Sequence, residues 1–180
     1  MYLKHMKYNN SCFPCALQMA LVNVGNLPPT YGDKLEDDFN RMMADETGFT
    51  LNQRLPDETL IFKIIPSLGL PLGKGFLVGP KTLSGCEQAC ARKINEALTA
   101  NENVAFVIGF EHALAVFKDP RTGKWCKVYP CPESAGPYEN EYFDNICARG
   151  AKGFISLSED GSQDKDFTGG NFVMMVSQEH

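Results

Sequence analysis

The sequence contains no run of basic residues and no long apolar stretch. Its 17 Lys and Arg are outnumbered by 22 Asp and Glu, which gives a formal net charge of −5 at pH 7. The sequence therefore lacks a cluster of positive charge that would attract a phosphate backbone or an anionic lipid surface. We expect neither nucleic acid nor a membrane as a partner. The first residues, MYLKHMKYNN, lack the apolar core of a signal peptide. We therefore expect a cytoplasmic protein, in its own cell or in a host cell.

Histidine is scarce, and cysteine is present in an odd number. Of the three histidines, His5 and His180 lie near the ends, so His112 is the one inside the expected folded region. Seven cysteines without an export signal favour reduced thiols over a disulfide framework. The candidate chemistry therefore involves thiols and one central imidazole.

The pattern of apolar residues predicts an α+β protein. The length of 180 residues and 43% hydrophobic content fit one domain over residues 1–180. Helical spacing predicts helices first and, after them, an antiparallel sheet. The expected helices cover residues 11–25, 33–53, 57–68, 86–100 and 142–148, and the expected strands cover 104–109, 112–118, 124–130 and 153–158. Residues from about 160 to 180 are expected to form a mobile tail, in which NFVMMV either adds a strand or docks a partner.

The stretch NNSCFPCALQMALVNVGN, residues 9–26, places two cysteines at the start of the first expected helix. Pro14 suits the first turn, and Gly25 supplies a stop. A thiol is a useful nucleophile at neutral pH when its pKa is lowered, which a helix N-terminus or a neighbouring imidazolium achieves. The helix start offers the first effect to Cys12 or Cys15, and His112 is a candidate source of the second.

Two stretches of the chain resemble papain-like cysteine peptidases. NSCFPCALQMALVNVG resembles the nucleophile helix of the bacteriocin-leader-processing (double-glycine) type. The matching positions are Asn10, Cys12, Pro14, Leu17, Met19 and Gly25. INEALTANENVAFVIGFEHALAVF resembles the helix, strand and His-strand of that family, and HALAVFKDPRTGKWCKVYP is similar to the His-box of ubiquitin-specific proteases.

The resemblance implies a papain-like fold, in which the nucleophile helix packs on a C-terminal antiparallel sheet. It implies a thiol hydrolase that uses Cys12 as nucleophile and His112 as base, forms a thioester, and needs no cofactor or metal. The expected substrate is a protein or peptide, cleaved at a peptide, isopeptide or side-chain amide bond. Peptidase, deubiquitinase, deamidase and transglutaminase variants all remain open, as do a housekeeping, viral or effector role. An alignment shifted to papain's own Cys-x-x-Cys-Trp makes Cys15 the nucleophile and gives Asn9 the oxyanion role.

The sequence departs from the family pattern at two positions. The oxyanion glutamine of the family falls on Met6, which cannot donate a hydrogen bond, so Asn9, Asn10 or backbone amides would replace it. The family's Asp aligns with Tyr129, and Glu133 is the nearest carboxylate expected on the same face to orient His112.

Two other classes of protein fit parts of the sequence. Three close cysteine pairs would suit a zinc site. They are Cys12 with Cys15, Cys86 with Cys90, and Cys126 with Cys131. A papain-like fold whose site has decayed into a binding module is the other alternative, because the glutamine and aspartate are missing.

Overall fold

The computed structural model combines helices with antiparallel strands and describes residues 1–79, 85–109, 112–149, 153–158, 165–168 and 172–179. The helices are α1 (Cys12–Asn23), α2 (Lys34–Thr47), α3 (Glu58–Ile64) and α5 (Glu87–Thr99), with short 3-10 turns at Ile65–Leu68 and Glu133–Ala135. The strands are β1 (Phe76–Val78), β2 (Val104–Gly109), β3 (Ala113–Lys118), β4 (Trp125–Val128), β5 (Glu141–Phe143), β6 (Asn145–Ala148), β7 (Gly153–Ser158), β8 (Lys165–Thr168) and β9 (Phe172–Ser177). The α+β class predicted from the sequence is thus confirmed.

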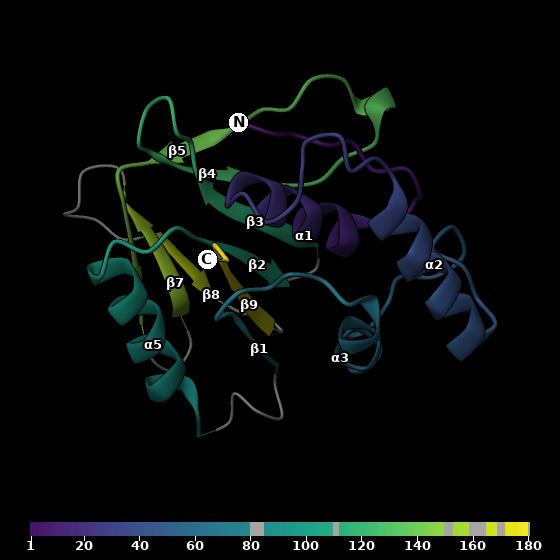
Figure 1. Ribbon diagram of the computed structural model, residues 1–180, viewed down its shortest axis with the longest axis horizontal. Coiled ribbons are helices and arrows are strands. Elements are labelled where there is room, and N and C mark those ends of the chain that lie inside the picture. Colours follow the sequence, from purple (N-terminus) through teal and green to yellow (C-terminus); the bar gives the residue numbers. More distant parts are fainter. Residues whose placement is uncertain (80–84, 110–111, 150–152, 159–164, 169–171, 180) are drawn as a thin grey trace.

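The strands form two sheets. The larger sheet has the order β1-β9-β2-β3-β4-β5, the smaller one has the order β6-β7-β8, and the strand pairs are antiparallel. The turn between β3 and β4 closes as a hairpin at the predicted DPRTG, where Asp119 N–H donates to Lys124 O at 2.8 Å. Figure 1 shows β2, β3 and β9 in the middle of the larger sheet, beneath α1.

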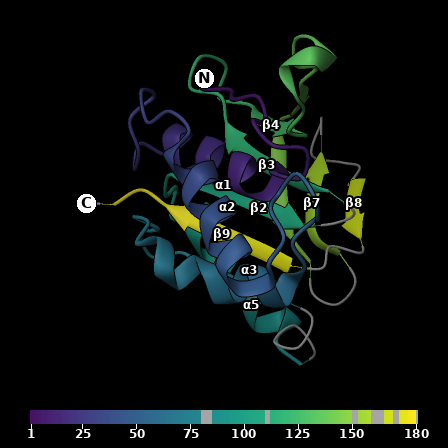
Figure 2. The ribbon, with the colours of Figure 1, turned by 90° about the vertical axis from the view of Figure 1, so that its right-hand side faces the viewer.

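Helix α1 is the centre of the packing on one face of the larger sheet. Its residues from Cys12 to Val22 are buried, and it contacts both β2 and β3. Along β2, Ala105 and Val107 face α1, whereas Phe106 and Ile108 belong to a second core with α5 and the small sheet. Figure 2 shows β7 and β8 beyond β2 and β3 as seen from α1. Because both faces of the sheet are covered, β2 is apolar along its whole length.

The ends of α1 follow the predicted signals. Cys15 N–H donates to Ser11 O at 3.0 Å, which begins the helical pattern directly after Ser11. At the other end Gly25 has φ +88°, and Asn26 N–H donates to Leu21 O at 2.9 Å. This is the left-handed glycine stop that satisfies the last carbonyl groups of a helix. Both ends of α1 therefore lie where the local sequence predicts them.

Two expectations about the C-terminal third need correction. Phe172–Ser177 is strand β9, buried between β1 and β2, and is not part of a mobile tail, because its apolar side chains fill both cores. Of the two roles considered for NFVMMV, the added strand is the observed one. Residues 142–148 form β5 and β6 rather than a helix, because each pairs with a strand of a different sheet. The rest of the expected tail lies largely outside the described residues.

Candidate active site

Cys12 lies at the N-terminal end of α1 and lines a pocket of about 280 Å³. The wall comes from four places in the chain: the start of α1, the loop into α3, the junction of β2 and β3, and the first residue of β9. The lining residues are Cys12, Phe13, Leu55, Pro56, Asp57, Glu58, Ile61, Gly109, Ala113 and Phe172. Gly109 pairs with Phe172 across β2 and β9, and a Cβ at Gly109 would lie 2.0 Å from the Phe172 ring. A glycine is therefore needed at this wall of the pocket.

The Cys12 thiol is buried, and its surroundings disfavour the thiolate. Cys12 is only 3% exposed. Burial raises the pKa of the Cys12 thiol, and the backbone N–H groups of Ala113, Phe13 and Cys12 itself lower it by a smaller amount. The net direction is opposite to the lowering expected from a helix start. Activation of this sulfur therefore requires a base that removes its proton when a substrate is present.

His112 directly precedes the residue that touches Cys12. The Ala113 amide faces the Cys12 sulfur, so the structure brings the chain at His112 to the edge of the pocket. The His112 side chain is exposed, and it makes no hydrogen bond or ion pair with the part of the chain that the structure describes. His112 is not itself among the residues that line the pocket, so the structure brings its neighbour Ala113, and not the imidazole, into contact with Cys12.

Cys15 occupies a different environment from Cys12. It is fully buried on the side of α1 that faces the N-terminal segment, and its Sγ donates to Lys4 O at 3.0 Å. Burial raises the pKa of the Cys15 thiol strongly, and the Glu36 carboxylate raises it further. Cys15 does not line the Cys12 pocket. This geometry favours Cys12 over Cys15 as the nucleophile.

The candidate oxyanion residues lie on the loop that enters α1. Asn9 N–H donates to Asn52 Oδ1 at 3.0 Å, and Asn10 N–H donates to Leu51 O at 2.9 Å, so each residue is held through its own backbone N–H group. The Asn9 side chain is exposed and that of Asn10 is half-buried. Met6, in the position of the family's glutamine, is buried, and its N–H donates to Cys131 O at 2.9 Å. The backbone amides of Ala113, Phe13 and Cys12 face the sulfur, with that of Ala113 having the largest effect on it.

The candidates for orienting His112 lie after β4. Extending the register in which Ala115 pairs with Val128 would place His112 opposite Cys131, two residues beyond Tyr129 and two before Glu133. Tyr129 is 43% exposed, and the Lys127 ammonium lies over its ring at 5.3 Å. Glu133 begins the 3-10 turn Glu133–Ala135 and is exposed. Asp119 is committed to the hairpin turn, where it accepts from Arg121 N–H at 3.0 Å.

A buried carboxylate fixes the segment that leads into α1. Glu36 of α2 is 0% exposed and accepts hydrogen bonds from the Lys4 ammonium, from Lys7 N–H at 2.9 Å and from Ser11 Oγ at 2.6 Å. Lys4 also pairs with Asp33 at 3.0 Å. Because Ser11 immediately precedes Cys12, this network sets the position of the candidate nucleophile.

Two chemically relevant features of the structure were not predicted from the sequence. Glu58 lines the Cys12 pocket, but an acidic residue in a first helical turn is common and gave no separate signal. His5 stacks on Tyr138 with ring centroids 4.7 Å apart, and its Nδ1 lies 3.8 Å from Cys131 Sγ. Nothing in the local pattern near residue 5 predicts that contact, because its partners are more than a hundred residues away.

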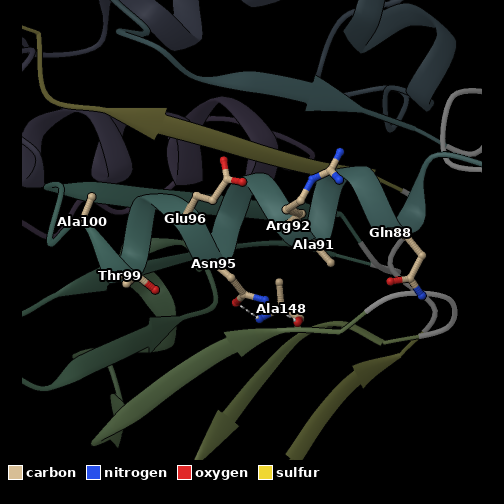
Figure 3. Close-up of a pocket in the computed structure, with 8 residues that line it drawn as sticks. All are labelled: Gln88, Ala91, Arg92, Asn95, Glu96, Thr99, Ala100 and Ala148. Carbon is tan, nitrogen blue, oxygen red and sulfur yellow. Dashed lines mark hydrogen bonds between the residues drawn. The ribbon is translucent and has the colours of Figure 1, made fainter.

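A larger hollow of about 640 Å³ lies elsewhere, along α5 beside Ala148. Figure 3 shows Asn95 pointing toward Ala148, and two hydrogen bonds of 3.0 and 2.9 Å join this side chain to the Ala148 backbone. The lining residues of this hollow in the described chain include neither a cysteine nor a histidine. It therefore offers neither a thiol nor an imidazole, and the Cys12 pocket is the better candidate despite its smaller volume.

Metal binding and membrane insertion find no support among the described residues. No three His, Cys, Asp or Glu side chains gather there as metal ligands. No helix within the described ranges has the length and apolar character needed to cross a bilayer.

Comparison with family models, with characterised proteins and with solved structures gives no match for this chain.

Proposed function

We propose that the protein is a papain-like thiol hydrolase that cleaves an amide bond of a protein or peptide, with Cys12 as nucleophile and His112 as general base. The observation that carries the proposal is the junction of α1 and β3. The Cys12 sulfur lies at the pocket wall against Ala113, the residue that follows His112. A helix carrying the thiol, packed on an antiparallel strand that follows the histidine, is the arrangement that the sequence resemblance implies.

The reaction begins from the neutral thiol, because burial raises the pKa of Cys12. With a substrate in the pocket, His112 takes the thiol proton as the sulfur forms a bond to the carbonyl carbon. The carbonyl oxygen becomes negative and accepts from the Cys12 and Phe13 amides, with Asn9 or Asn10 as a side-chain donor. The C–N bond then breaks, and His112 delivers the proton to the leaving amine. Water hydrolyses the thioester, which releases a carboxylic acid and restores the thiol.

Glu133 would orient His112 after movement of its exposed turn toward the imidazole. A residue with this role supports the correct tautomer of the base without touching the substrate. Replacing Glu133 with glutamine should then lower kcat more than it changes KM, and should shift the acidic limb of the pH profile. If neither kcat nor the pH profile changes in Glu133→Gln, Glu133 has no orienting role and His112 acts as the base of a catalytic dyad.

The test is hydrolysis of a mixed peptide library at pH 7 to 8, followed by mass spectrometry. The unmodified protein should cleave amide bonds, and Cys12→Ala and His112→Ala should abolish cleavage. Cys15→Ala is the matched control, because it removes a buried thiol of the same helix that does not line the pocket. Cleavage that survives in Cys12→Ala, or that is lost in Cys15→Ala while the fold is intact, would contradict the assignment.

A second candidate function is a binding module that retains the fold without catalysis. The raised pKa of the buried Cys12 thiol favours it, as do Met6 and Tyr129 in the positions of the family's glutamine and aspartate. This candidate predicts that the library remains intact and that peptides bind equally to the unmodified protein and to Cys12→Ala.

A further inference from the structure

The pocket beside Cys12 combines an apolar wall with negative charge. Its apolar part includes Leu55, Ile61 and Phe172. The charged residues among its described lining are Asp57 and Glu58, and both are acidic. An apolar wall that ends in carboxylates matches a long aliphatic side chain with a cationic head, as in lysine and arginine.

The two carboxylates are not equivalent. Asp57 Oδ1 accepts from Leu60 N–H at 2.9 Å and caps α3, so this group is already used by the backbone. Glu58 is half-buried and has no hydrogen bond or ion pair with the residues that the structure describes. It lies against the end of β1, where a Cβ added at Gly79 would come 3.6 Å from Glu58 Oε2. Glu58 is therefore the carboxylate free to meet a ligand.

The environment of Glu58 favours a cation over a neutral group. Burial raises the pKa of Glu58, and the neighbouring Asp57 carboxylate raises it further. The ionised carboxylate thus has no ion-pair partner among the residues that the structure describes. A cation placed beside it would favour ionisation and would itself be held by the charge.

We propose that this pocket selects a substrate residue of the lysine or arginine type, whose aliphatic stem contacts the apolar wall and whose cationic head pairs with Glu58. The inference rests on the proposed function, because it places the selected residue next to the bond that Cys12 attacks. Glu58 is a specificity residue in this account and takes no part in bond breaking.

The test compares three methanethiosulfonate reagents that modify Cys12: trimethylammonium-ethyl (cationic), methyl (neutral) and sulfonatoethyl (anionic). In each reaction the Cys12 sulfur attacks the sulfenyl sulfur, a disulfide forms and methanesulfinate leaves. Rates at Cys12 are measured at pH 8 by peptide mapping and divided by the rates of the same reagents with free cysteine. The corrected ratio of cationic to anionic rates should exceed one and should fall roughly two- to fivefold in Glu58→Gln.

Asp45→Asn is the matched control, because Asp45 is an exposed carboxylate of α2 that does not line the pocket. It changes the net charge equally and should leave the ratio unchanged. In the unmodified protein, lowering the pH through the raised pKa of Glu58 should remove the preference, since the reagents keep their charges and Cys12 ionisation cancels in the ratio.

If Cys12 reacts without a charge preference, or keeps the same preference in Glu58→Gln, this inference is overturned and the proposed function is unaffected. Cys12 that reacts with none of the three reagents would overturn the proposed function and the inference with it.

Discussion

Replacing Glu36 with glutamine tests how the start of α1 is held. Glu36 is fully buried and accepts from the Lys4 ammonium, Lys7 N–H and Ser11 Oγ. Removing one partner of a buried ion pair costs about 3–5 kcal/mol, because the other charge is left uncompensated. Lys4 retains its pair with Asp33 at 3.0 Å, so we expect the lower end, about 3 kcal/mol of unfolding free energy.

Urea unfolding measures this loss directly. Trp125, the single tryptophan, is 6% exposed and reports on the core by fluorescence. With a urea dependence of about 2–3 kcal/mol per molar, the midpoint should fall by roughly 1–1.5 M at an unchanged slope. Glu46→Gln is the control, since its pair with Lys63 at 2.6 Å is exposed and should contribute less than about 1 kcal/mol. If Glu36→Gln costs no more than this control, the buried network does not hold the Cys12 end of α1.

Three further predictions concern the walls of the site and its thiols. Gly109→Ala should cost about 1–3 kcal/mol in urea unfolding, because the new Cβ would lie 2.0 Å from the Phe172 ring; an unchanged midpoint would contradict the packing. Without added substrate, the alkylation rate of Cys12 should keep rising with pH above the range of an ordinary thiol, because burial raises the pKa of Cys12. A plateau at mildly acidic pH would instead indicate a preformed ion pair. Cys15→Ala should cost roughly 1–3 kcal/mol, since it empties a buried site and removes the hydrogen bond to Lys4 O, yet should leave the labelling rate of Cys12 unchanged.

Local signals in the sequence predicted the elements that they bracket. Pro14 and Gly25 mark the beginning and the end of α1, and the DPRTG turn sets the pairing of β3 with β4. The sequence did not decide whether NFVMMV forms a strand, because the partners of β9 are distant in sequence. Strands β1 and β2 flank it, and an apolar run alone does not reveal such neighbours. Apolar residues at 142, 143, 146 and 147 also fit one helix face, so the pattern alone favoured a helix over two short strands.

Some features of the candidate site also follow from the local sequence, whereas others depend on residues that are distant in the chain. The position of Cys12 at a helix start follows from the local sequence, and the structure places it beside the strand that follows His112. The raised pKa of its thiol depends on burial by elements from the whole chain, which no local motif specifies. Glu58 enters the pocket through the packing of α3, so its role also required the fold.

The most direct test of the central claim is covalent capture of the nucleophile at pH 7 with peptidyl acyloxymethyl ketones that carry alanine or lysine next to the ketone. These reagents form a thioether when a thiol and a base act together at a bound peptide. We predict one adduct, on Cys12, that is retained in Cys15→Ala and lost in His112→Ala although the variant remains folded. An adduct on another cysteine, or one on Cys12 that forms equally fast without His112, would contradict the assignment of Cys12 and His112 as a catalytic pair.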